Sequence, residues 1–522
     1  IPFVAFSVPH YSFCVERKTK KEKNMVTFRV TQLPKRHARE HLSKLSPRME
    51  DSETIQLLED MNTVMCKKHT TSTRLPESVS GAVKRMIESA RYNATAAQGL
   101  SDFAKLMVAE KLLKISSSGI PEDILPENYE GIIHDIKVSG YHADDKIYSN
   151  NAEIRQKIPR GTTLLELKKS GEEETIQDVL IYANRKFTGD IGDEDDVQQP
   201  ESNEWKKYFL KDQDKAQRVV CMKKINGEAA HFSARKINGK FYIITGSKNV
   251  HMIIKEKEDI DKYIGDRFTV AKIVARCLWD TLHELEEKHF NLLLKFLDLT
   301  KCTAICELLQ PENQHIMNLS QLERPVLNVI GFTPPAGDES CSSLIALPPH
   351  HTLNFLSGLG LTTPTYTVIQ VEDVQKYRDE IRHGEHGYHE EGEVLYFLTE
   401  DEETIGLVKA KTVWYIMLRA LREKVVYGFR ASRRRQQQNI NECITSCHKR
   451  FYEIQEWLLF SNSFLDKWKT LAESFILWMA EEVREERVAV ENIRPQYPVM
   501  WEKFLLVEQL TDRVELKYQD KT

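Results

Sequence analysis

One tetrapeptide occurs twice in the sequence, and the lysine of each copy is a candidate for a reactive side chain. Lys-Ile-Asn-Gly occurs at residues 224–227 and again at residues 236–239. A lysine amine becomes a nucleophile only in its uncharged form, which burial, nearby cations or a metal ion favour. The rest of the sequence must therefore supply such an environment around Lys224 or Lys236, or else both tetrapeptides are turns.

The flanking residues distinguish the two copies. The second copy lies between AHFSARK and KFYIITG, and Asn-Gly between two β-prone runs is a strong signal for a two-residue hairpin turn. The first copy follows QRVVCMK and precedes Glu228 and the outgoing strand, so it lies at the entrance of a strand. We predict that residues 236–239 form a turn and that Lys224 faces a pocket.

Further residues in chain order resemble the motifs of the covalent nucleotidyltransferases, the superfamily of DNA ligases, RNA ligases and mRNA capping enzymes. Lys224–Gly227 resembles the KxDG or KxHG nucleophile motif. The later motifs are Ser247-Lys248, Glu307 in AICELL, Glu391-Gly-Glu-Val and Lys409-Ala-Lys411. Trp414 and Tyr415 after the last motif resemble the KxKxxWY of the phage RNA ligase 1 and tRNA ligase branch.

The resemblance implies an α+β fold with a nucleotidyltransferase core of antiparallel sheets and an ATP-dependent RNA ligase activity. Lys224 would attack the α-phosphorus of ATP, and the AMP would pass to an RNA 5′-phosphate that a 3′-hydroxyl then attacks. The implied cofactors are ATP and Mg²⁺ or Mn²⁺. The implied ATP site comprises Lys224, Asn226, Gly227, Lys248, Glu307, Phe332, Glu391, Lys409 and Lys411.

Spacing and residue chemistry refine these roles. Lys409 and Lys411 are two residues apart, so on a strand they share a face, can reach phosphate oxygens and favour the uncharged Lys224 amine. Glu307 and Glu391 would bind the metal ion, because hard cations with phosphate partners prefer carboxylates. Phe332 could stack on adenine or pack in the core.

Alternatives to the ligase hypothesis remain open. Asn226 stands where the family motif has an acidic residue or histidine, which leaves room for a catalytically weakened relative that binds nucleotide or RNA. A capping guanylyltransferase would use GTP, and the segment after Lys411 disfavours it. Arg185 lies upstream of Lys224 where related ligases have an arginine, although a surface position is the simpler interpretation.

Three charged segments have rival interpretations. Arg430, Arg433, Arg434 and Arg435 could bind RNA phosphates, form a solvated helix face or act as a nuclear-localisation signal. The histidines at 383, 386 and 389 could bind a metal ion, but the intervening glycines favour a loop. For the acidic segment at 190–204 we favour a solvated loop over a cation site.

Helices, strands and whole domains must position these residues. Apolar spacing predicts helices between 51 and 116, a Ser-, Gly- and Pro-rich boundary at 115–131, and a hairpin around Ser170-Gly171. One long helix is expected over 268–298, short strands over 303–309, 315–319 and 325–332, and a last strand ending near Lys411. We expect a helical module over 1–130, an adenylyltransferase domain over 155–420 and a helical domain over 421–522.

Composition bounds the class of protein. The chain has 522 residues, of which 41% are hydrophobic and 29% charged, as is ordinary for soluble globular domains. The net charge of −5 excludes a protein that coats nucleic acid by bulk charge, so RNA contacts need local basic patches. Nine cysteines without CxxC pairs and the lack of an apolar run of about 18 residues predict an intracellular protein, cytoplasmic or nuclear, without a membrane span.

Overall fold

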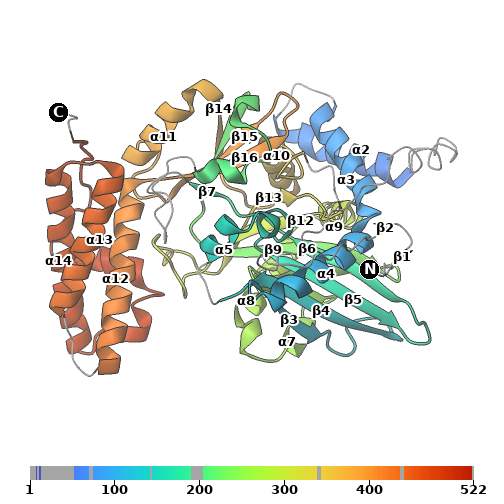
Figure 1. Ribbon diagram of the computed structural model, residues 1–522, viewed down its shortest axis with the longest axis horizontal. Helices are drawn as coiled ribbons and strands as arrows, with labels where there is room; N and C mark the ends of the chain where they lie inside the picture. Colours follow the sequence, from blue (N-terminus) through green and yellow to red (C-terminus); the bar gives the residue numbers. More distant parts are fainter. Residues whose placement is uncertain are drawn as a thin grey trace, which may run out of the picture. The chain divides into compact units, whose positions relative to one another are not determined.

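A computed structural model describes residues 7–8, 11–12, 52–69, 74–140, 144–189, 204–337, 342–435 and 440–519. The chain divides into two compact units, Ile1–Gln56 and Leu57–Thr522. In the first unit, β1 (Ser7–Val8) and β2 (Tyr11–Ser12) form a short antiparallel pair. The second unit is a mixed structure of antiparallel sheets and helices (Figure 1).

The expected helices before residue 116 are present. They are α2 (Ser52–His69), α3 (Glu77–Ala90) and α4 (Asn93–Ala109). α3 buries Val79, Val83 and Met86 in an apolar cluster that includes Leu292 and Phe296 of α9 (Glu287–Thr300). Apolar spacing at a period of 3.6 residues predicted these helices because each one presents a single face to the core.

A four-stranded sheet follows, in the order β3-β4-β5-β6. Its strands are β3 (Leu113–Gly119), β4 (Tyr129–Val138), β5 (Thr162–Lys169) and β6 (Thr175–Tyr182), and α5 (Asp144–Asn150) and α6 (Ala152–Lys157) lie between β4 and β5. The predicted hairpin around Ser170-Gly171 is confirmed, with φ of 85° at Gly171.

The predicted domain boundary at 115–131 is wrong. Residues 113–119 pair with β4 as the edge strand of the four-stranded sheet, and the Pro-rich residues that follow form the turn between these two strands. The serines of Lys-Ile-Ser-Ser-Ser-Gly fit an edge strand because backbone groups make the ladder bonds while polar side chains stay partly exposed.

The β9 sheet is the second sheet, with the strand order β11-β10-β9-β12-β13. Its strands are β9 (Glu228–Ile237), β10 (Lys240–Ser247), β11 (Val250–Ile254), β12 (Thr303–Leu309) and β13 (Val326–Thr333). Phe232 and Ile244 of this sheet share one apolar cluster with Ile133, Leu165 and Leu180 of the four-stranded sheet.

The predicted single helix over 268–298 is two helices, α8 (Thr269–His283) and α9. The chain leaves helical geometry at Glu286, whose ψ is 138°. α8 packs against β10 and α9 against β9, so each helix follows a different strand. No glycine or proline marks the break, which explains why the sequence did not reveal it.

The β8 sheet is the third sheet, with the strand order β14-β8-β15-β16-β7. Its strands are β7 (Thr188–Gly189), β8 (Arg218–Lys223), β14 (Tyr366–Gln370), β15 (Gly392–Leu398) and β16 (Thr404–Lys411). All pairs are antiparallel except β16 with β7. The expected end of the last strand near Lys411 is confirmed.

The remaining short elements connect these sheets. They are η1 (Glu204–Tyr208), η2 (Gln213–Lys215), α7 (Asp259–Lys262), η3 (Asp266–Phe268), α10 (Pro349–Leu359), η4 (Val371–Asp373), α11 (Val374–His383) and η5 (Val490–Asn492). The strand predicted at 315–319 is absent from the described structure. Its backbone N–H groups instead donate to side chains: Ile316 and Met317 to Asn226, and Leu319 to Gln314.

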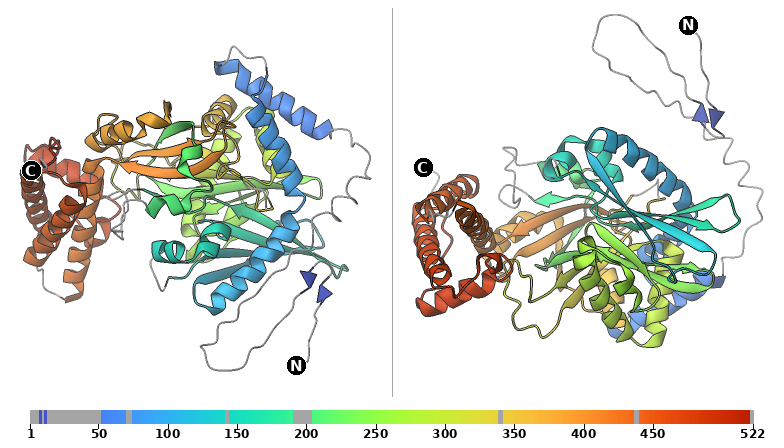
Figure 2. Two further views of the ribbon diagram at one scale, coloured as in Figure 1. Left: turned by 45° about the horizontal axis from the view of Figure 1, so that its top comes forward. Right: turned by 90° about the horizontal axis from the view of Figure 1, so that it is seen from below.

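The last part of the chain is helical, as expected. It comprises α12 (Val413–Arg435), α13 (Ile440–Leu458), α14 (Asn462–Arg484) and α15 (Tyr497–Val507). α12, α13 and α14 lie side by side (Figures 1 and 2) around buried Trp468, Phe475 and Trp501. The change from strand to helix comes at Thr412, so the expected boundary after residue 420 falls inside α12. Among the described helices, none is long and apolar enough to cross a membrane.

Candidate active site

The first tetrapeptide connects two different sheets. β8 ends at Lys223 in the β8 sheet, and β9 begins at Glu228 in the β9 sheet. The backbone N–H of Lys224 donates to the carbonyl of Gly392 at 2.9 Å, which fixes the connection against the start of β15. Lys224 therefore lies where side chains from both sheets can reach it.

A buried carboxylate pairs with the Lys224 ammonium. The Lys224 Nζ atom lies 3.0 Å from Oε1 of Glu391, and the Glu391 side chain is only 3% exposed. Lys411 on β16 is also buried, and its Nζ lies 5.4 Å from the centre of the Tyr415 ring. Burial alone would raise the pKa of Glu391, but the two lysine charges and a hydrogen bond from Asn226 hold that pKa below its usual value. Glu391 is thus an anion at neutral pH.

Asn226 uses both ends of its amide. Its Nδ2 donates to Oε2 of Glu391 at 2.7 Å and contacts the Tyr415 hydroxyl at 3.4 Å. Its Oδ1 accepts from the N–H groups of Ile316 at 3.0 Å and Met317 at 3.2 Å. An aspartate here would lack the donor and would repel Glu391, so asparagine fits this arrangement better than aspartate.

Glu307 approaches the tetrapeptide from β12, the strand beside β9. Its Oε1 accepts a hydrogen bond from the Gly227 N–H at 3.2 Å. A Cβ atom at Gly227 would lie 2.3 Å from the carbonyl oxygen of Leu308, so only glycine allows this close approach. Burial is the main cause that raises the pKa of Glu307 to about 7; the Lys224 charge opposes this rise and the Glu391 charge adds to it.

Lys409 shares a face of β16 with Lys411, as the two-residue spacing predicted. Val408 and Ala410 pack in an apolar cluster on one side of the strand, so alternation places the two lysines on the other side. The Lys409 Nζ lies 5.5 Å from the centre of the Phe187 ring. The charge of Lys411 acts on Glu391, the partner of Lys224.

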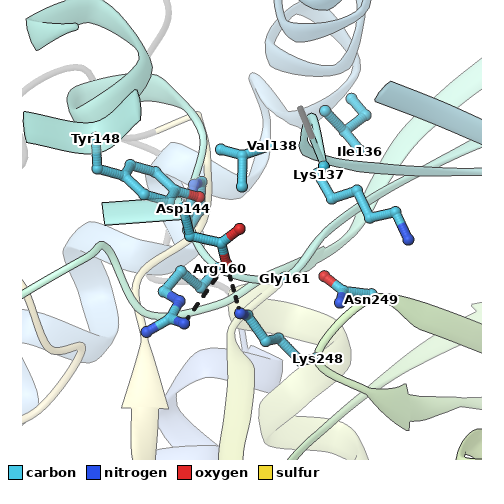
Figure 3. A pocket seen from close by; sticks show the side chains of 11 residues that line it. Ile136, Lys137, Val138, Asp144, Tyr148, Arg160, Gly161, Lys248 and Asn249 are labelled. Carbon is cyan, nitrogen blue, oxygen red and sulfur yellow. Dashed lines mark hydrogen bonds and ion pairs between the residues drawn. The ribbon is translucent and has the colours of Figure 1, made fainter. Parts of the chain in front are cut away.

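Lys248 lies in a cavity of about 200 Å³ beside α5 (Figure 3). Its Nζ is 2.8 Å from Oδ2 of Asp144, and Arg160 approaches the same oxygen at 3.7 Å. Burial and the Arg160 charge lower the pKa of Lys248. Tyr148 and Asn249 also line the cavity (Figure 3), whereas neither Glu307 nor Glu391 is among the described residues that line it.

Lys186 is a buried lysine that the motif comparison did not single out. Its Nζ lies 2.6 Å from Oδ1 of Asp145 with 2% of the side chain exposed, and its charge contributes to the lowered pKa of Lys248. Arg185, the residue considered instead, lines a separate small cavity. The sequence offered two adjacent basic residues, and only the fold reveals which one is buried.

His315 lies near Lys224 and Arg422 lies near His315, and neither residue belongs to a recognised motif. Burial and the Arg422 charge lower the pKa of His315 to about 4, so its imidazole is neutral at pH 7. Arg422 is buried on α12 and contacts Glu423 at 3.0 Å. No sequence signal marked either residue. His315 lies in the segment that was expected to be a strand, and Arg422 lies in a helix after the last motif.

Phe332 is not brought to this site. Its side chain is fully buried on β13, and its ring centre lies 4.9 Å from that of Phe296 on α9. This position favours the interpretation of Phe332 as a core aromatic over that of an adenine contact.

The histidines at the end of α11 contact different carboxylates. His386 Nε2 lies 3.1 Å from Glu380, and His389 Nε2 lies 2.9 Å from Asp512, while His383 bonds the backbone of its own helix. Their contacts do not converge, which favours the loop interpretation over a metal site at these three residues.

The charged segments are only partly described. Arg430 is exposed on α12, and residues 433–435 continue the same helix. The acidic segment at 190–204 lies outside the described residues except for Glu204. The helical setting of Arg430 fits both an RNA contact and a solvated helix face.

Trp414 and Tyr415 connect the site to the C-terminal helices. Tyr415 reaches Asn226, while Trp414 Nε1 donates to Oδ2 of Asp512 at 2.7 Å. Trp501 Nε1 donates to the same oxygen at 2.9 Å. A hydrogen bond to the buried carboxylate of Asp512, about a hundred residues later in the chain, therefore holds the start of α12 directly after Lys411.

Comparisons with known proteins complete the description of the site. No curated protein matches the sequence. The chain is similar to a solved structure described as "Archaeal ATP-dependent RNA ligase - form 1", with 13% identity, a TM-score of 0.38, and coverage of 72% of this chain and 77% of that chain. A family model matches residues 129–422, which include every residue from Lys224 to Lys411 discussed above. The chain therefore belongs to the family described as "Domain of unknown function (DUF7920)".

Proposed function

We propose that this protein is an ATP-dependent RNA ligase that joins an RNA 5′-phosphate to a 3′-hydroxyl. The Lys224 amine loses its proton and forms a bond to the α-phosphorus of ATP, while the bond to the bridging oxygen breaks and pyrophosphate leaves. The resulting lysyl-AMP transfers its AMP to the RNA 5′-phosphate, and the 3′-hydroxyl then displaces AMP to form the phosphodiester.

One observation carries the proposal: Lys224 meets Glu391, Lys411 and Glu307 at the junction of the β8 and β9 sheets. Glu391 pairs with the Lys224 ammonium, Glu307 accepts from the Gly227 N–H, and the charges of Lys224 and Lys411 both act on Glu391, although these residues are far apart in the sequence. Phosphoryl transfer depends on positioning and on neutralising negative charge, and buried lysines supply that charge without having to be reorganised.

The carboxylates fit a divalent ion. The raised pKa of Glu307 means that the positive charges and hydrogen bonds around it do not fully offset the burial of its carboxylate. A Mg²⁺ or Mn²⁺ ion bound beside Glu391 would supply the missing positive charge. Such an ion would neutralise phosphate charge during the reaction. Glu307 and Glu391 are the residues that would hold it, and Lys224 and Lys411 would contact the nucleotide phosphates.

The bonding of Asn226 argues against the weakened relative. A site that had lost its activity would be expected to leave the substituted side chain with poor contacts. Asn226 instead bonds Glu391 on one side and the backbone at Ile316 and Met317 on the other. We infer that asparagine replaces the usual acidic residue or histidine as a positioning residue for Glu391.

The surrounding chain has supporting roles in this proposal. The three sheets would form the adenylyltransferase domain, which includes β3 and β4 because β4 pairs with both β3 and β5, and residues 421–522 would belong to a C-terminal helical domain that begins with α12. The exposed Arg430 and the following Arg433, Arg434 and Arg435 on α12 would contact the RNA backbone, because arginines on one helix offer several phosphate donors. Lys248 would contact the nucleotide from its own cavity.

Covalent labelling tests the first step. Purified full-length protein is incubated with Mg²⁺ and α-labelled ATP or GTP, and the adduct is tested for acid lability and alkali stability. We expect label from ATP in wild type and in Lys236→Ala but not in Lys224→Ala. Label from GTP alone would favour a guanylyltransferase, and no label in a folded wild-type protein would contradict the ligase and favour the binding relative.

RNA joining tests the later steps. The same proteins are mixed with ATP and a 5′-phosphorylated, 3′-hydroxyl RNA, and the products are separated by size. Wild type should produce joined or circular RNA, and an RNA with a 5′-hydroxyl should remain unjoined. Labelling without any joining would restrict the function to nucleotide transfer.

A further inference from the structure

A second cluster of side chains lies at the β15–β16 turn. His350 and His351, in the first turn of α10, approach Glu402 in this turn. His350 Nε2 is 3.5 Å from Oε1 of Glu402, and His351 Nε2 is 3.2 Å from Oε2. One ligand atom from each residue lies within 4.8 Å of the other two.

The cluster is partly buried but open to an ion. The side chains of His350, His351 and Glu402 are 15%, 18% and 13% exposed. Glu402 adopts a φ of 62°, an uncommon conformation for a residue other than glycine, and positions of this kind recur at sites that hold ligands. His350 Nδ1 is buried and has no hydrogen-bond partner among the described residues.

Two further contacts orient the Glu402 carboxylate. Ser78 Oγ on α3 donates to Oε2 at 2.6 Å, and Arg218 Nη2 at the start of β8 lies 3.0 Å from Oε1. The Arg218 side chain is 39% exposed, so it can move into solvent when a cation takes its place.

We propose that His350, His351 and Glu402 bind a zinc ion. Two imidazole nitrogens and a carboxylate oxygen form a ligand set that zinc prefers, and the Ser78 hydroxyl or a water molecule can fill the fourth position of a tetrahedron. The ion would connect α10, the β15–β16 turn and, through Ser78, α3 (Figure 1).

This zinc site is separate from the proposed active site. Arg218 and Lys223 are the two ends of β8, and the pairing of Leu398 with Arg218 and of Glu393 with Lys223 places them at opposite ends of the β8 sheet. Five residue steps along a strand span about 17 Å. The zinc ion would therefore stabilise the end of the β8 sheet opposite to Lys224, Glu391 and Lys411, and it would take no part in phosphoryl transfer.

Cobalt(II) binding tests the proposal, because cobalt reports tetrahedral coordination by visible absorption. Full-length protein is stripped of metal with a chelator, dialysed and titrated with Co²⁺. We expect one equivalent to produce ligand-field absorption that one equivalent of Zn²⁺ abolishes and Mg²⁺ does not. Zn²⁺ should also raise the midpoint of thermal unfolding.

Matched variants locate the ion. His351→Gln and Glu402→Gln should weaken cobalt binding at least about 100-fold, because each removes a ligand. His383→Gln is the control, since it alters a histidine of the rival metal site at the end of α11, and it should bind cobalt like wild type. Lys224→Ala should also bind cobalt normally, which separates this result from that of nucleotide labelling.

Two outcomes would overturn the zinc site. Wild type without cobalt absorption would show that the histidines and Glu402 form only ion pairs, and equal binding by wild type and His351→Gln would place the ion elsewhere. If Glu402→Gln does not fold, His351→Gln still decides the question, because that histidine makes fewer contacts.

Discussion

The two Lys-Ile-Asn-Gly tetrapeptides have the same sequence but different structures. At 236–239 the chain turns within one hairpin, with φ of 47° at Asn238 and 80° at Gly239, and β9 pairs directly with β10. At 224–227 the chain passes from the β8 sheet to the β9 sheet, and Asn226 is buried. The same four residues thus form a solvent-exposed turn in one place and the proposed reactive centre in the other.

The difference shows that the neighbours, and not the tetrapeptide, determine the local structure and contacts. The backbone N–H of Lys236 contacts Asp298 at 3.0 Å, and its ammonium lies 5.8 Å from the Phe241 ring. Lys224 instead faces Glu391, with Lys411 and Glu307 nearby. Matched substitutions in the two copies can therefore separate effects of position from effects of residue type.

The largest contrast should come from the lysines. Lys224→Ala should reduce covalent labelling by ATP at least about 1,000-fold, because no other group can replace a missing nucleophile. Lys236→Ala should label like wild type. Equal loss in both variants, with both proteins folded, would remove the distinction between the tetrapeptides.

The asparagines should differ by a smaller factor. Asn226→Ala should slow labelling by about 10- to 100-fold, because Glu391 loses a hydrogen bond and two backbone N–H groups lose their acceptor. Asn238→Ala should leave the labelling rate unchanged and affect only the stability of the turn. Single-turnover rates at saturating ATP measure this contrast, and a normal rate in Asn226→Ala would show that Glu391 needs no positioning.

The glycines should differ in stability. Gly227→Ala should cost about 3 kcal/mol of unfolding free energy, since the new Cβ would lie 2.3 Å from a backbone oxygen. Gly239→Ala should cost about 1 kcal/mol, because its positive φ is strained for alanine although the space around it is open. Urea denaturation of both variants measures the difference, and a smaller loss for Gly227→Ala would show that β12 can move away.

The fourth effect concerns pH. The pKa of Glu307 is raised to about 7 in the fold, above its unfolded value, so its contribution to stability is present below about pH 4 and is lost as pH rises through 7. Glu307→Gln should therefore gain about 1 to 3 kcal/mol relative to wild type between pH 5 and pH 8. Asp298→Asn, beside the second tetrapeptide, is the matched control. Parallel pH profiles for wild type and Glu307→Gln would contradict the raised pKa.

Local sequence signals predicted the elements that local forces determine. The Asn-Gly turn at 238–239 and the C-terminal helices follow from backbone preferences and apolar spacing over a few residues. The convergence of Lys224 with Glu391 and Lys411 was expected only from the resemblance to nucleotidyltransferases. No periodicity could place residues so distant in the sequence next to one another.

Features that depend on tertiary contacts were not predictable. Residues 315–319 look like a strand, yet their N–H groups bond to Asn226 and Gln314. Phe332 lies on the expected strand, but the alternation of side chains does not say which face meets a ligand and which meets α9. Lys186 and Arg422 are buried, and nothing in the sequence distinguishes them from exposed basic residues.

The buried Asp512 has a consequence for how the protein is made. Its carboxylate accepts hydrogen bonds from the indole nitrogens of Trp414 and Trp501, and the first of these lies just after Lys411. During synthesis residue 414 leaves the ribosome long before residue 512. The hydrogen bond that holds the start of α12 therefore cannot form until Asp512 has been made. We expect a nascent chain that stops before residue 512 to hold Lys411 loosely, which would keep incomplete chains from reacting with nucleotide.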